Sequence, residues 1–137
     1  MDLTDKRIAT LLQSNARMSF AEIGRVIALS RTAVQDRVTR MEERGEITGY
    51  HARLADPDAL GLAAVIFVRI NTRPCQPVLE WLRQLEGVSS VQSLSGETDA
   101  ILHCRLPSAD HLTRLNDQIG AHSAITEARS SLVLKTL

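Results

Sequence analysis

A short segment in the first half of the chain holds the polar side chains best suited to chemistry. Residues 29–47 read LSRTAVQDRVTRMEERGEI. On a helix turning about 100° per residue, Val34, Val38 and Met41 share one face. Thr32, Gln35, Asp36 and Thr39 lie opposite, with Arg31, Arg37 and Arg40 on the flanks. The candidate binding residues are these except Arg37, together with Ser30 at the start of the helix. Their hydroxyl, amide and carboxylate groups can bond base edges while guanidinium groups meet phosphates, so the pattern predicts a helix that binds double-stranded DNA.

The same face has a second interpretation. Polar side chains also cover solvated helices, and Asp36 and Arg40 have the i, i+4 spacing of an ion pair. Charge favours binding: residues 1–53 hold 9 Lys and Arg against 7 Asp and Glu, a net +2, whereas residues 54–137 total −2 in a chain of formal charge zero. A module that binds an effector without DNA is the alternative to a DNA-binding protein.

Histidines and cysteines give little sign of catalysis. His51, His103, His111 and His122 belong to no recognisable motif with a carboxylate or thiol partner. Cys75 and Cys104 lack the spacing of a metal site, and we expect both to be reduced and structural. There is no glycine-rich phosphate loop or nucleophile elbow. We therefore expect a protein without catalytic residues, metal or cofactor.

Composition is that of an ordinary globular protein, with 44% hydrophobic and 23% charged residues among 137. No apolar run approaches the ~20 residues that span a bilayer, and the start, MDLTDKR, lacks a secretory signal. We expect a cytoplasmic protein with no membrane partner.

Three helices must position the candidate binding face. Thr4 and Asp5 suit the start of the first. Ser19 and Glu22 form a capping box for the second, and Ser30 follows closely as the N-cap of the third. So tight a turn predicts a helix-turn-helix over residues 19–45, within a DNA-binding domain of residues 1–53. After Gly45, residues 46–54 predict a short strand or wing, and residues 54–62 a linker.

The second domain, residues 63–137, predicts the order βαββαβ. Strands are expected at 63–73, 88–96, 99–107 and 125–137; helices are expected at 77–87 and after Ser108. The fold class is therefore α+β, a winged helix-turn-helix followed by a ferredoxin-like domain. The first strand is apolar on both faces, yet helices cover one face only, so a second subunit is expected on the other.

Several motifs resemble the Lrp/AsnC (feast/famine) transcription regulators. They are Asp5-x-x-Ile8 with Leu11 and Leu12, "AR-S--EI" in residues 16–23, "LS-T-V--RV-RMEE-G-I-GY-A-L" in residues 29–54, and Leu60-Gly61. The resemblance implies a DNA-binding regulator whose ferredoxin-like domains pair sheet to sheet as homodimers, which commonly assemble into octamers. Ala28 departs from the family's usual turn glycine, and a left-handed conformation there would cost about 1 kcal/mol.

The resemblance also points to the loop SGETDA. Gly96-Glu97-Thr98-Asp99 is similar to the family's Gly-x-x-Asp signature, which helps to bind a small effector, usually an amino acid, where dimers meet. The implied effector residues are Leu94, Ser95, Gly96, Glu97, Thr98 and Asp99. Turn chemistry alone also explains Gly and Asp in a tight hairpin. Haem-precursor decarboxylases resemble the same two-part architecture, which makes an enzyme the alternative function.

Overall fold

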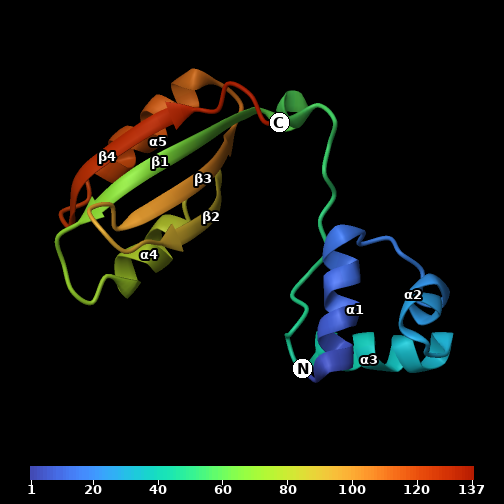
Figure 1. Cartoon of the computed structure of the whole chain (residues 1–137). Helices are drawn as coiled ribbons and strands as arrows, with labels where there is room; N and C mark the ends of the chain where they lie inside the picture. The colour runs from blue at the N-terminus through green and yellow to red at the C-terminus, as the bar shows by residue number, and fades with distance from the viewer. The chain divides into compact units, whose positions relative to one another are not determined.

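The chain folds into two compact units, Met1–Arg53 and Leu54–Leu137 (Figure 1). The structure, a computed structural model, describes residues 1–137 except for the side chains of Pro57 and Asp58. Each unit has a hydrophobic core of its own residues. None of the described helices is long and apolar enough to cross a membrane.

Three helices form the first unit: α1 (Leu3–Ser14), α2 (Phe20–Ile27) and α3 (Arg31–Glu43). The predicted apolar face of α3 is confirmed, since Val34, Val38 and Met41 are all buried. They pack with the remaining core residues, which are Ile8, Leu12, Ile23 and Ile27. Burying these side chains on one side leaves the opposite side of α3 exposed.

Side chains at the helix starts satisfy the free backbone N–H groups. Ser19 and Glu22 form the predicted capping box, with reciprocal bonds of 2.7 and 3.1 Å, and Ser30 caps α3 as predicted. Thr4 and Asp5 lie in the first turn of α1, as expected, but the N-cap precedes them. Asp2 is the N-cap, and Asp5 returns a bond to the Asp2 backbone.

Backbone geometry fixes both ends of α3. Ala28 adopts the left-handed conformation, with φ 58° and ψ 47°, as its place in the turn suggested. Gly24 packs against the Leu29 carbonyl, where a Cβ would collide. At the other end Gly45 has φ 68°, and Glu46 N donates to the Met41 carbonyl over 2.8 Å, a Schellman ending. The predicted strand or wing at 46–54 is wrong: those residues form no strand, because no neighbouring segment pairs with them.

The second unit has the predicted ferredoxin-like order. After the 3-10 turn η1 (Pro57–Leu60) come β1 (Leu62–Ile70), α4 (Gln76–Arg83), β2 (Val88–Ser93), β3 (Ala100–Leu106), α5 (Ala109–Gly120) and β4 (Ile125–Leu132). The strands lie in the order β2-β3-β1-β4, and every neighbouring pair is antiparallel. Helix α4 and strands β1, β2 and β4 each end three to five residues earlier than expected.

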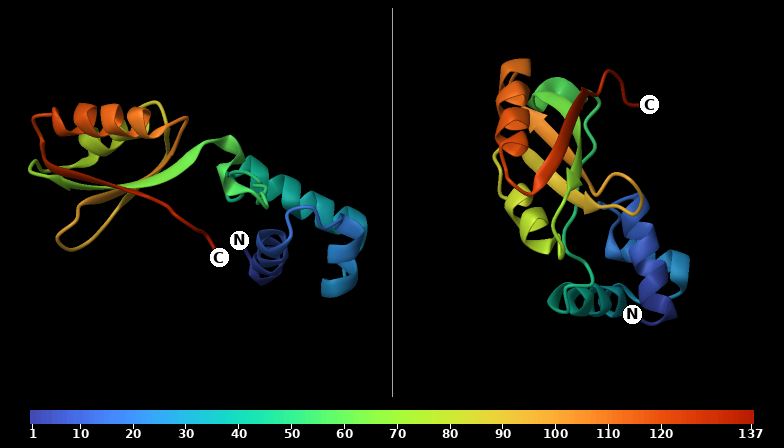
Figure 2. Two further views of the ribbon diagram at one scale, coloured as in Figure 1. Left: turned by 90° about the horizontal axis from the view of Figure 1, so that it is seen from above. Right: turned by 90° about the vertical axis from the view of Figure 1, so that its left-hand side faces the viewer.

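Both helices cover the same face of this sheet (Figure 2). Ala64, Ile66, Val68 and Ile70 of β1 point into the core beneath them and are at most 4% exposed. Ala63, Val65 and Phe67 alternate with them and are only partly buried. The opposite face therefore presents an apolar strip in the single chain.

Candidate DNA-binding helix and effector loop

The exposed side of α3 carries every residue predicted to bind DNA. Ser30, Arg31, Thr32, Gln35, Asp36, Thr39 and Arg40 are all exposed. The Ser30 hydroxyl accepts the Ala33 N–H at 3.1 Å, which leaves its own O–H able to donate. The helix thus offers a polar surface opposite the side that packs into the core.

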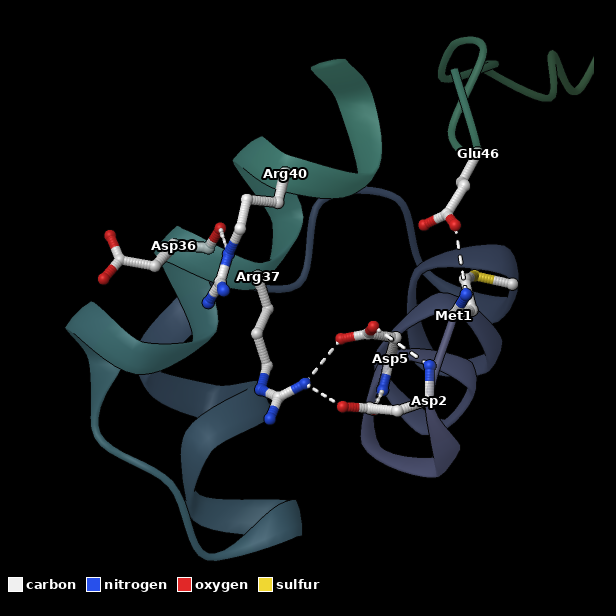
Figure 3. Close-up of polar contacts among 7 residues, drawn as sticks. All are labelled: Met1, Asp2, Asp5, Asp36, Arg37, Arg40 and Glu46. Carbon is white, nitrogen blue, oxygen red and sulfur yellow. Dashed lines mark hydrogen bonds and ion pairs between the residues drawn. The ribbon is translucent and has the colours of Figure 1, made fainter. Parts of the chain in front are cut away.

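Asp36 and Arg40 do not form the expected ion pair. Arg40 Nε instead donates to the backbone carbonyl of Asp36 at 3.2 Å, and the Asp36 carboxylate points away from the guanidinium (Figure 3). An i, i+4 backbone acceptor competes successfully with the carboxylate on this exposed face. The charge of Asp36 is therefore presented separately from that of Arg40.

Arg37 is held by the first helix. Its Nη1 donates to Asp2 Oδ2 at 2.6 Å and to Asp5 Oδ1 at 2.7 Å (Figure 3). The hydrogen bonds from Arg37 are the largest influence on the pKa of each carboxyl, and both pKa values are lowered. The sequence placed Arg37 on the flank of the binding face, but nothing in helical spacing indicates a partner 32 residues earlier.

The predicted effector residues lie together in the connection between β2 and β3. Leu94, Ser95, Gly96 and Glu97 are exposed; Thr98 and Asp99 are partly buried. Gly96 adopts a positive φ of 100°, which favours glycine in this turn. Arg69 Nε donates to the Glu97 carbonyl at 3.1 Å and ties the tip of the loop to β1.

Asp99 is occupied by contacts within its own chain. Oδ2 accepts the Ile70 N–H at 2.7 Å, and Oδ1 accepts Arg73 Nη2 at 2.9 Å. The bond from Ile70 is the main reason that the pKa of Asp99 is lowered, and Arg73 adds to it. These contacts support a role for Asp99 in fixing the loop.

A small hollow of about 80 Å³ adjoins the loop on the uncovered face of the sheet. It is lined by Phe67, Arg69, Glu97, Thr98, Glu127 and Arg129. The Arg129 guanidinium lies 5.3 Å from the centre of the Phe67 ring, and Arg69 approaches Glu127 at 3.8 Å. Sequence reasoning missed the members from β1 and β4; strand alternation could have found them, because they share one face.

Three of the four histidines, which lie on different segments, form side-chain hydrogen bonds within the second unit. His103 contacts Gln92, His111 contacts Ser108, and His122 accepts the Ala124 N–H. Among the described residues, no group of three or more His, Cys, Asp or Glu side chains has the geometry of a metal site. Burial raises the pKa of the Cys104 thiol to about 11, which disfavours the reactive thiolate.

Two domain families match the chain. Residues 1–42 match the AsnC-type helix-turn-helix domain, and residues 63–137 match the Lrp/AsnC ligand binding domain. The HTH-type transcriptional regulator Rv2324 of Mycobacterium tuberculosis is 36% identical, over all of this chain and 94% of its own length.

Solved structures agree with these matches. The Leucine response regulatory protein (LrpA) of M. tuberculosis is 30% identical with a TM-score of 0.77, covering 99% of this chain and 94% of the other. The transcriptional regulator NMB0573 of Neisseria meningitidis, in complex with L-Met, is 31% identical with a TM-score of 0.76, covering 98% and 90%. A helix-turn-helix unit, a ferredoxin-like unit and relatives along the full length place this chain in the Lrp/AsnC family of DNA-binding transcriptional regulators.

Proposed function

We propose that this protein regulates transcription by reading a specific duplex sequence with α3. The observation that carries the proposal is the two-sided character of that helix: three buried apolar residues on one side, seven exposed polar residues on the other. Thr32 and Gln35 bond base edges, Arg31 and Arg40 contact phosphates, and Asp36 accepts from a cytosine amino group. The regulators among its relatives support this role, and their names argue against the decarboxylase alternative.

A homodimer is the proposed binding unit, and dimers assemble further, up to an octamer. The uncovered strip of β1 supports sheet-to-sheet pairing, because exposed apolar sheet surface favours association. Two helix-turn-helix units related by two-fold symmetry would meet half-sites about 34–36 Å apart, or a multiple of that distance. The expected operator is therefore close to palindromic.

The proposed effector is an amino acid bound at the β2–β3 loop. The L-Met complex of the Neisseria regulator supports this ligand class. The hollow beside the loop is also suited to a zwitterion, since it combines guanidinium groups, carboxylates and an aromatic ring. An effector acts only through its difference in affinity between two assemblies, and a coupling of about 1–3 kcal/mol would change DNA affinity about 5- to 150-fold.

The test of DNA reading begins with selection of the preferred duplex from random DNA, followed by anisotropy titrations. Gln35→Ala should weaken binding to the selected duplex by roughly 1–3 kcal/mol and to scrambled DNA much less. Arg40→Ala is the matched control: it should weaken both alike and reduce the salt slope by about one. Equal weakening of both duplexes by Gln35→Ala would show that α3 reads with another face.

Calorimetric titration with the twenty amino acids tests the effector. Any amino acid that binds should then change the affinity for the selected duplex. If none binds the wild-type protein, the loop is a hairpin and the second unit serves assembly alone.

A further inference from the structure

All four carboxylate oxygens of Asp2 and Asp5 accept hydrogen bonds at the contact between Arg37 and the start of α1. Asp2 Oδ1 accepts the Asp5 N–H at 2.8 Å, and Asp5 Oδ2 accepts the Asp2 N–H at 3.2 Å. The two remaining oxygens both bond the same nitrogen, Arg37 Nη1 (Figure 3). One guanidinium of α3 therefore bridges both halves of the capping box that starts α1.

These bonds constrain α3 in a way that its core does not. Ile8 and Leu12 of α1 meet α3 through apolar contacts, which favour burial without selecting a direction. Charge-assisted hydrogen bonds are short and directional, and the Arg37 pair supplies the side-chain hydrogen bonds between α1 and α3 among the described residues. Among the residues that the structure describes, Asp5 is the one charged residue that is buried, with 7% of its surface exposed.

The turn from α2 cannot replace this constraint. Gly24 and Ala28 fix the start of α3, but a rigid start still permits the helix to tilt about it. Thr39 lies nine residues beyond Ser30, about 13 Å along the axis, so a tilt of ~10° would move it by ~2 Å. A shift of that size is enough to break a hydrogen bond to a base edge.

We propose that Arg37 is a positioning residue for DNA reading: it holds the pose of α3 through the capping box of α1 and does not itself contact phosphate. The proposal rests on the function proposed above. It separates Arg37 from its neighbour Arg40, although both are arginines on one helix. Removing Arg37 should reduce selectivity while leaving the electrostatic part of binding unchanged.

Full-length wild type, Arg37→Met and Arg40→Ala would be titrated against the selected and scrambled duplexes at several salt concentrations. Arg37→Met should lower the ratio of the affinities for the selected and scrambled duplexes about tenfold, which lies within the discrimination that one base contact supplies. The affinity for the scrambled duplex and the salt slope should be nearly unchanged. Arg40→Ala should reduce the slope and keep the ratio. If Arg37→Met behaves like Arg40→Ala, Arg37 is a phosphate contact and the proposal is wrong.

Asp5→Asn gives an independent test, which remains usable if Arg37→Met folds poorly. It keeps one oxygen for the Asp2 N–H but loses the charge that holds Arg37. Positioning predicts a lower affinity ratio, as in Arg37→Met; a latent phosphate contact predicts tighter binding to both duplexes and a steeper salt slope. If both variants are as selective as the wild type, the proposal for Arg37 is wrong, but the proposed DNA-binding function stands. A wild type without a preferred sequence would instead refute the proposed function.

Discussion

Replacing Asp99 should lower the free energy of unfolding of the second unit by more than the loss of its ion pair with the exposed Arg73 explains. In Asp99→Ala, the backbone N–H of Ile70 loses its acceptor, and that residue is only 4% exposed. Leaving a buried donor unsatisfied costs about 1–3 kcal/mol. The lost ion pair adds at most about 1 kcal/mol, because the Arg73 side chain is 65% exposed. The expected loss in the free energy of unfolding is thus about 1–4 kcal/mol.

Two variants separate these contributions. Arg73→Ala removes the ion pair but keeps the bond to Ile70, so it should cost less than about 1 kcal/mol. Asp99→Asn keeps an oxygen for Ile70 and should fall between the two. Urea unfolding followed by Trp81 fluorescence measures all three, since Trp81 is the single tryptophan and lies in the same unit.

The pH dependence of stability gives a further test of the contribution of Asp99. Because the folded-state pKa of Asp99 is lowered, its stabilisation is present above the unfolded pKa of about 3.9 and is lost as pH falls through the folded-state pKa. The difference between wild type and Asp99→Ala should accordingly shrink on acidification below pH ~4. If Asp99→Ala costs no more than Arg73→Ala at neutral pH, the bond to Ile70 contributes little and Asp99 is available to a ligand.

Two further outcomes follow from backbone strain and the uncovered sheet face. Ala28→Gly should stabilise the first unit by about 0.5–1 kcal/mol in thermal unfolding, because glycine tolerates the left-handed conformation; Ala121→Gly, at a right-handed helix end, should not stabilise. Phe67→Lys should shift the oligomer toward monomer in analytical ultracentrifugation with the fold intact, whereas Ile66→Ala, in the core, should destabilise folding by about 2–5 kcal/mol. A Phe67→Lys protein that remains a full dimer would place the interface elsewhere.

Local patterns in the sequence predicted most of the architecture. Ser19 with Glu22, Ser30, and the apolar spacing of Val34 and Val38 each act within a few residues, so the sequence carries them directly. The N-cap of α1 was not predicted because its capping box pairs Asp with Asp, outside the usual Ser or Thr with Glu or Gln. Residues 46–54 have strand-forming composition, but a strand requires a partner that the single chain does not supply.

The candidate sites were harder to predict wherever contacts join distant segments. Arg37 meets carboxylates 32 and 35 residues away, and Asp99 bonds a backbone group 29 residues earlier. No periodicity records such pairs. The motif identified the β2–β3 loop, but only its contacts distinguish a residue that shapes the loop from one that faces a ligand.

The separate cores of the two units have a consequence for how such a regulator can diverge. Changes that repack the residues around Ile8 or Ile23 act within a core that contains no residue of the sheet domain. Substitutions far apart and without shared partners have nearly additive effects on stability. Lineages could therefore change the residues of one unit by separate steps, without each change requiring compensation in the core of the other.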